Sequence, residues 1–262
     1  ARFDARKHLA QPVVGDAQAG LKELGNALHG WQAPESWLAD ARRAYGEWNG
    51  FVDQRSGPTN AELPTYAHVI GAVNRLCDPR DLALTAAGGM PGELCMCWRA
   101  STTSSFDCEF GFSCMGYEIA GGLGIKLAHP ERRVIVFVGD GSYLMMNSEI
   151  VSSVMMGAKL DIVVTDNSGF GCINRLQQAC GGRPFNNLFE DVKRVRDVKI
   201  DFAAHARAMG ALAEKVTSIA ELEAALARAK TQDRTSVIVI DTDAVTQQQV
   251  DKIVKTGNPN YF

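Results

Sequence analysis

The sequence predicts an α/β fold: a doubly wound, mainly parallel sheet with helices on both faces. Two apolar runs, residues 134–138 and 160–165, have the composition of strands buried on both faces, and each ends in a polar, glycine-rich turn. Between Gly141 and Asn167 lie 25 residues, enough for a crossover helix and a return strand. Strand-like and helix-like segments alternate along the rest of the chain, an order typical of parallel sheets.

The other elements follow from apolar periodicity and turn residues. Helices are predicted over residues 64–77, 116–128, 147–157, 172–179, 201–209 and 219–230, and further strands over residues 82–87, 213–216 and 236–240. The glycines between residues 116 and 124 do not form Gly-x-Gly-x-x-Gly, and no Gly-Lys-Ser/Thr follows them. We therefore exclude a Rossmann or P-loop nucleotide site.

The chain divides into three predicted parts. Residues 1–32 contain a strand-like run at 11–16 and a helix at 17–28, which cannot bury a core by themselves, so we expect them to end a preceding middle domain. Residues 33–62 are expected to be a linker helix and loop, with aromatic rings that pack onto the next domain. Residues 63–262 form the main predicted domain.

Composition is that of an ordinary globular protein, with 46% hydrophobic residues. The 262 residues carry a formal net charge of −3, so no attraction to nucleic acid or to an anionic membrane is expected. No apolar run approaches the ~20 residues that span a bilayer. The seven cysteines are typical of reduced, buried thiols in a cytoplasmic protein. Cys95 and Cys97 lack the second ligand pair of a zinc site, which leaves a metal role as the minor alternative.

Oxygen-bearing side chains stand where the first two strands end. Asp140 offers a carboxylate and Asn167 a side-chain carbonyl. Because the carboxyl ends of parallel strands meet at one edge, we expect both in one crevice. Such ligands suit Mg²⁺, and also Mn²⁺ or Ca²⁺. The alternative is that both are ordinary turns, in which Asp and Asn serve capping and turn chemistry.

Gly139-Asp140-Gly141, followed at this distance by Asn167, resembles the signature of thiamine-diphosphate-dependent enzymes. The resemblance implies the diphosphate-binding domain of that fold, with thiamine diphosphate and Mg²⁺ as cofactors. It implies that Asp140, Asn167 and the main-chain carbonyl of Gly169 bind the metal. The residues that it implies for cofactor binding are Gly88, Gly89, Met90, Cys114, Met115, Gly139, Asp140, Gly141, Ser142, Asn167, Gly169, Phe170 and Gly171.

The resemblance extends upstream of the metal turn. Residues 109–122 are similar to the segment that precedes the metal site in acetolactate-synthase-type members, and Met115 stands where a bulky apolar residue bends the cofactor. The turn at residues 88–92 stands where the family places the aminopyrimidine and diphosphate. A plain turn is the alternative there.

Residues 85–94, 106–122, 173–177 and 230–235 are most similar to the branch that hydrolyses a C–C bond of a cyclic 1,2-diketone in inositol breakdown. This implies that Asn174, Arg175 and Gln178 meet the substrate, although they would equally suit a solvated helix. The alternatives are an acetolactate-synthase-like carboligase, a 2-oxo acid decarboxylase and a non-catalytic cofactor-binding fragment.

The family's activating Glu comes from a different domain, usually across a subunit interface, and no residue here matches its context. The resemblance therefore implies a pyrimidine-binding domain, upstream or on a partner subunit, and a homodimer or homotetramer. The sequence leaves open whether Ala1 is the natural start. Residues 246–262 do not match the longer tail of the family.

Overall fold

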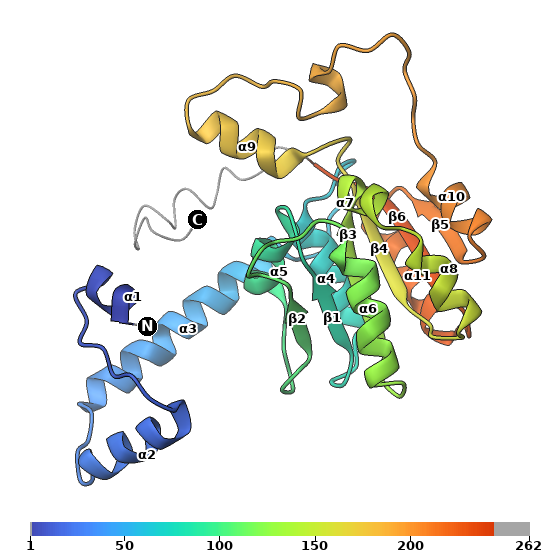
Figure 1. The fold of residues 1–262 in the computed structure, drawn as a ribbon. Helices are drawn as coiled ribbons and strands as arrows, with labels where there is room; N and C mark the ends of the chain where they lie inside the picture. Colours follow the sequence, from blue (N-terminus) through green and yellow to red (C-terminus); the bar gives the residue numbers. More distant parts are fainter. Residues whose placement is uncertain (1, 244–262) are drawn as a thin grey trace. The chain divides into compact units, whose positions relative to one another are not determined.

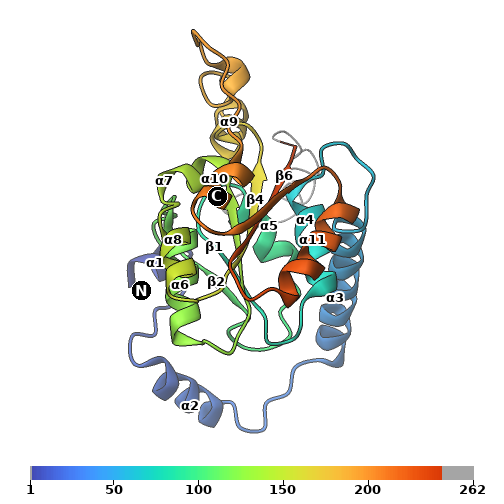
Figure 2. The same cartoon turned by 90° about the vertical axis from the view of Figure 1, so that its right-hand side faces the viewer.

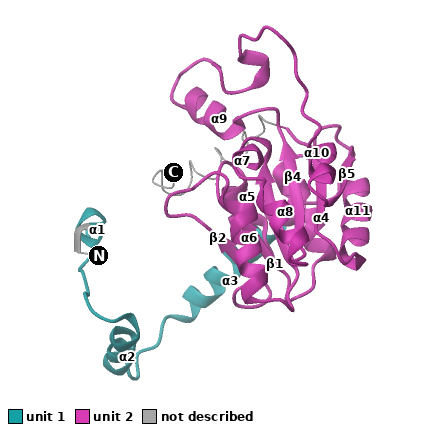
Figure 3. Ribbon diagram, turned by 45° about the vertical axis from the view of Figure 1, so that its right-hand side comes forward, with its two compact units in different colours: residues 1–50 teal, residues 51–262 magenta. Residues whose placement is uncertain are grey.

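The computed structural model describes residues 2–243, with side chains from residue 4 onward, and divides into two units, residues 1–50 and 51–262 (Figure 3). The first unit holds helices α1 (Arg2–Lys7) and α2 (Ala17–Ala27) and most of α3 (Glu35–Arg55). The side chain of Asp16 caps α2 by accepting the N–H of Ala19 at 2.9 Å. The prediction for residues 246–262 lies outside the described residues.

The strand predicted at residues 11–16 is wrong. The segment has no regular structure, and Val13 is 87% exposed. A strand needs a hydrogen-bonded neighbour, and none of the described residues supplies one. The helix over 33–62 is present as α3; that its aromatic rings pack onto the next domain stays a prediction.

Six parallel strands form one sheet in the second unit, which confirms the predicted fold class (Figure 1). The strands are β1 (Leu82–Thr85), β2 (Phe106–Cys108), β3 (Val134–Gly139), β4 (Asp161–Asp166), β5 (Leu212–Val216) and β6 (Ser236–Asp241), in the spatial order β2-β1-β3-β4-β6-β5. Strand β2 was not predicted, because its three residues lie at the sheet edge and carry no buried-strand pattern.

Helices cover both faces of this sheet (Figure 2). The helices are α4 (Tyr66–Leu76), α5 (Met90–Cys97), α6 (Tyr117–Ala128), α7 (Asp140–Met145), α8 (Glu149–Met155), α9 (Gly171–Ala179), α10 (Phe202–Ala208) and α11 (Ile219–Thr231), with a 3₁₀ turn at Phe189–Asp191. Helices α6, α7, α8 and α10 share one apolar core with the sheet. Helices α4, α5 and α11 pack together on the opposite face.

Two turns of the prediction are helices in the structure. Residues 90–97 form α5, with Pro91 in its first turn, where the missing N–H costs no hydrogen bond. Asp140 begins α7 directly after β3, so the metal turn is the start of a short helix. Both helices are too short for apolar periodicity to reveal them, and their glycines favoured the prediction of turns.

The cysteines are more exposed than predicted. All seven lie in the described part of the chain and none is paired there, but Cys95, Cys114 and Cys180 are exposed. No cluster of three or more His, Cys, Asp or Glu side chains within residues 2–243 has the arrangement of a metal site. Likewise, none of the helices that the structure describes is both long and apolar enough to cross a bilayer.

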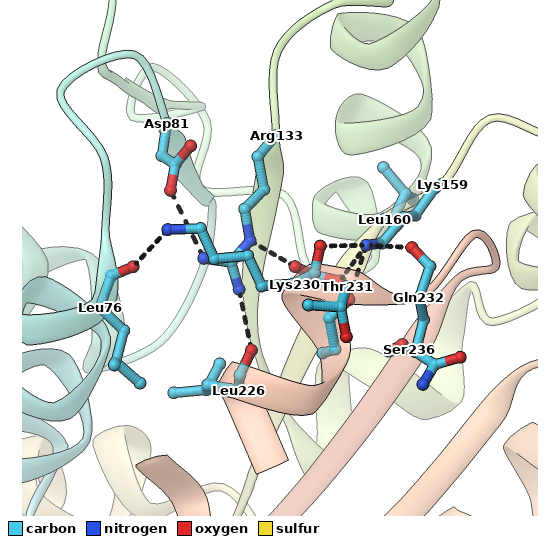
Figure 4. A network of polar contacts seen from close by, with 12 residues as sticks. Leu76, Asp81, Arg133, Lys159, Leu160, Leu226, Lys230, Thr231, Gln232 and Ser236 are labelled. Atoms are coloured by element: carbon cyan, nitrogen blue, oxygen red, sulfur yellow. Dashed lines mark hydrogen bonds and ion pairs between the residues drawn. The ribbon is translucent and has the colours of Figure 1, made fainter. Parts of the chain in front are cut away.

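Charged side chains fasten the amino-terminal edge of the sheet (Figure 4). Arg133 donates to Asp161 at 2.5 Å and to Asp81 at 3.4 Å, and so joins the segments that enter three strands. Lys159 donates to the carbonyls of Ala229 and Gln232, at the end of α11. These cationic side chains pair with carboxylates and main-chain carbonyls of neighbouring segments, and so hold the amino-terminal edge together.

Candidate cofactor and metal site

The predicted site residues gather at the carboxyl edge of the sheet. Strand β1 lies between β2 and β3, so the chain goes from β1 to β2 on one side of it and then crosses to β3 on the other side. A crevice opens at such a reversal in parallel sheets and is where their ligands bind. Gly88 follows β1, Asp140 follows β3 and Asn167 follows β4, and each strand neighbours the next. The structure therefore brings the three predicted turns together.

Asp140 is a buried carboxylate with a fixed position. Its Oδ2 accepts the N–H of Gly169 at 2.8 Å, which joins the ends of β3 and β4. Burial, followed by the charge of Asp166, raises the pKa of Asp140 from 3.8 to about 7, against the effect of the backbone N–H groups nearby. None of the ion pairs among the described residues includes Asp140, so a divalent cation would supply the counter-charge for its carboxylate.

Asn167 has a buried side-chain oxygen to spare. Its Nδ2 donates to the hydroxyl of Tyr66 at 2.7 Å, whereas its Oδ1 is buried and has no hydrogen-bond partner among the residues described. Such an orphaned oxygen is costly unless something binds it. Together with Asp140 it provides the hard oxygen ligands that Mg²⁺ prefers, so the residues present fit the metal.

Neighbouring Asp166 shows the ordinary turn chemistry. Its Oδ1 accepts the N–H of Ser168 at 2.9 Å, an Asx turn. The alternative that these residues only stabilise a turn therefore holds for Asp166, but it does not explain the unbonded side-chain oxygen of Asn167.

The turn after β4 is held by a second segment. Gly169 has φ +145°, and an added Cβ would overlap the carbonyl oxygen of Asn187. Phe170 donates its N–H to that same carbonyl at 2.7 Å, and Phe189 donates to Ser168 at 2.9 Å. Only glycine fits this backbone, and the Gly169 carbonyl as a metal ligand stays a prediction.

Apolar side chains lie over the start of α7. An added Cβ on Gly141 would lie 2.7 Å from the ring of Phe170 and 3.5 Å from the methyl of Met115. Both side chains are partly exposed. The structure thus places Met115, the predicted bending residue, beside Gly141 of the predicted metal turn.

Glu118 is a site residue that the sequence reasoning missed. This buried carboxylate accepts the N–H of Gly116 at 3.0 Å, the hydroxyl of Ser142 at 2.7 Å and the N–H of Ala87 at 3.3 Å. It therefore links the end of β1, the start of α6 and the first turn of α7. No specific signal in the sequence points to it, because an acidic residue in the first turn of a helix is common.

The turn after β1 faces α9. Gly88 has φ +83° and open space around it, whereas an added Cβ on Gly89 would overlap Arg175 and lie 3.2 Å from the Tyr66 ring. Met90 is buried, and Cys114 is exposed with its N–H bonded to Glu109 at 2.6 Å. Gly139 and Gly171 lie at the end of β3 and the start of α9.

Only Arg175 of the three predicted substrate residues has a contact that places it at the crevice. Its guanidinium lies against Gly89. Asn174 is 2% exposed, and its Oδ1 has no hydrogen-bond partner in the described part of the chain. Gln178 is exposed on α9, as a solvated helix residue would be.

Tyr66 is the second missed residue. It lies in the first turn of α4, where it looked like part of an ordinary amphipathic helix. Burial raises the pKa of Tyr66 to about 12, so its hydroxyl keeps its proton at neutral pH. Its bond to Asn167 spans 101 positions, and no local pattern predicts such a contact.

Comparison with known proteins agrees with this geometry. Residues 87–240 match the family described as "Thiamine pyrophosphate enzyme, C-terminal TPP binding domain". The 3D-(3,5/4)-trihydroxycyclohexane-1,2-dione hydrolases of Geobacillus thermodenitrificans and Bacillus licheniformis are 37% and 34% identical over 91% and 90% of this chain. The chain spans 42% and 41% of the lengths of these relatives. Because the family match covers more than half of the sequence, this chain belongs to the thiamine pyrophosphate enzymes and carries their C-terminal cofactor-binding domain.

Proposed function

We propose that this chain is the diphosphate- and metal-binding part of a thiamine-diphosphate- and Mg²⁺-dependent hydrolase of C–C bonds. Its substrate would be trihydroxycyclohexane-1,2-dione, which water opens between the two carbonyl carbons to give 5-deoxy-glucuronate. The similarity to trihydroxycyclohexane-1,2-dione hydrolases supports this substrate over a carboligase or decarboxylase reaction. The observation that carries the metal assignment is the buried Oδ1 of Asn167, which has no hydrogen-bond partner among the described residues. Asn167 follows β4, and Asp140 follows the neighbouring strand β3.

The chain's own residues would hold both cofactors. Asp140, Asn167 Oδ1 and the Gly169 carbonyl would bind Mg²⁺, which would also meet the diphosphate. Gly88, Gly139, Gly141, Ser142 and Gly171 stand around the same edge, where close backbone approach to phosphate oxygens needs small residues. When bound, thiamine diphosphate supplies a nucleophilic thiazolium carbon and an electron sink for C–C bond cleavage.

Side chains around the crevice would orient the substrate and limit water. Met115 and Phe170 supply an apolar wall beside Gly141. Arg175, against Gly89, would place a positive charge toward a polyol or a developing carboxylate. Asn174 and Gln178 complete this proposed substrate set.

The rest of the site would come from a second domain. The relatives are more than twice as long as this chain, consistent with an additional pyrimidine-binding domain that carries the activating Glu. We place that domain upstream or on a partner subunit of a homodimer or homotetramer. Unpaired cysteines fit the reducing cytoplasm, where we place this step of myo-inositol breakdown.

The test follows the substrate directly. The full-length protein with Mg²⁺ and thiamine diphosphate is mixed with the cyclic dione, and the loss of dione absorbance and the appearance of acid are recorded. We expect loss of the dione only when the cofactor is present. If cofactor binds but the dione persists while pyruvate is consumed, the chain belongs to a carboligase or decarboxylase and the proposed substrate is wrong.

A further inference from the structure

We propose that Tyr66 is a positioning residue, which turns the Asn167 amide so that its oxygen, and not its nitrogen, faces the metal site. This inference rests on the proposed function, because it concerns a ligand of the proposed Mg²⁺. Tyr66 reaches Asn167 from α4, on the face of the sheet that also carries α5 and α11. No part of the sequence signature includes it.

An asparagine amide has two nearly isosteric ends with opposite chemistry. The oxygen accepts hydrogen bonds and binds cations, whereas the NH₂ group donates and repels them. A half-turn of the side chain would present N–H groups to the cation. The metal site therefore needs a partner that holds the nitrogen end elsewhere.

Tyr66 is that partner. Its hydroxyl oxygen accepts the Nδ2 group of Asn167 at 2.7 Å, so the nitrogen end of the amide is held at α4. The nearby Thr165 hydroxyl does not compete for this nitrogen end, because it donates to the carbonyl of Val138 at 3.4 Å.

With its nitrogen end bonded to Tyr66, Asn167 keeps Oδ1 available as a ligand for the metal. It is buried and has no partner among residues 2–243, although the nitrogen of the same amide is satisfied. The bond to Tyr66 forms within the protein itself, so it holds the amide in this orientation before any metal arrives.

The ring of Tyr66 is fixed independently of its hydroxyl. The N-cap Thr65 accepts the N–H of His68 and starts α4 at this residue. The ring also lies against Gly89, where an added Cβ would be 3.2 Å away. Tyr66→Phe should therefore keep the packing and remove only the oxygen that holds the amide.

The test measures Mn²⁺ binding to the full-length protein by the electron paramagnetic resonance of free Mn²⁺, with thiamine diphosphate present and substrate absent. We expect Tyr66→Phe to weaken Mn²⁺ binding by about 10–100-fold, as other residues that support a metal ligand do. Tyr143→Phe is the matched control, because it removes a buried hydroxyl that is bonded to His205 at 3.1 Å. The control should leave Mn²⁺ affinity within about twofold.

A second substitution separates orientation from general damage. In an Asn167→Asp background both ends of the side chain are oxygens, so turning it no longer matters. Adding Tyr66→Phe to that background should cost less than about threefold in Mn²⁺ affinity. An equal loss in both backgrounds would show that Tyr66 acts through packing alone.

The outcomes distinguish this inference from the proposed function. If the unmodified protein binds no Mn²⁺ in the presence of cofactor, the proposed function fails and the role of Tyr66 fails with it. If the unmodified protein binds Mn²⁺ and Tyr66→Phe binds it equally well, the orienting role alone is overturned.

Discussion

We expect Asp140→Asn to make the metal-free protein more stable at pH 8 and to remove the proposed cation binding. The folded-state pKa of Asp140 is raised from 3.8 to about 7 by burial and by Asp166. For a raised pKa, the favourable contribution of the group is fully present below pH 3.8 and is lost as the pH rises through about 7. The difference corresponds to a cost on the order of 4 kcal/mol at most, which a neutral amide of the same shape avoids.

The measurement is urea unfolding of the full-length protein in EDTA at pH 5 and pH 8. The gain from Asp140→Asn should be larger at pH 8. Asp201→Asn is the control, because Asp201 is an exposed cap of α10 that accepts the N–H of Ala204. The interpretation of Asp140 as a buried charge without a counter-ion would be contradicted if both variants gained the same unfolding free energy. It would also be contradicted if Asp140→Asn gained none at pH 8.

Gly169→Ala has the second large expected effect. Its φ of +145° is open to glycine only, and the added methyl would overlap Asn187 O and lie 2.9 Å from Leu188 Cα. We expect a loss of about 2–4 kcal/mol in the free energy of unfolding, together with loss of cation binding, because the N–H that holds Asp140 moves.

Gly124→Ala serves as the control for this prediction. It lies in α6 with no described heavy atom within 4 Å of the added Cβ, so alanine should stabilise the helix by up to about 1 kcal/mol. Unfolding by urea and Mn²⁺ titration would be applied to both variants. A Gly169→Ala protein with unchanged stability and cation affinity would show that the turn at 168–170 is not held as described.

The sequence predicted the fold because the evidence for it is local. Strands β3 and β4 are continuous apolar runs, and the 25 residues between Gly141 and Asn167 are enough for a crossover helix and a return strand. Segments with little apolar pattern were lost: β2 is a three-residue edge strand, and the run at 11–16 has strand composition without a neighbour. Composition alone does not report whether a hydrogen-bonded partner exists.

The site was predicted in part for the same reason. Asp140 and Asn167 stand at strand ends, so their meeting follows from parallel topology. Tyr66 and Glu118 were missed because they act through contacts between segments distant in sequence. Each lies on a helix whose pattern is fully explained by packing, and only the folded chain shows that one of its side chains turns toward the crevice.

The most direct test of the central claim is calorimetric titration of the full-length protein with thiamine diphosphate, with Mg²⁺ and with EDTA. We expect thiamine diphosphate to bind at least about tenfold more weakly in EDTA than with Mg²⁺. We expect Asp140→Asn to remove both the tight binding and its dependence on the cation. Thiamine diphosphate binding that is equally tight without a cation, or that survives Asp140→Asn unchanged, would contradict the assignment of the carboxyl edge as the metal and diphosphate site.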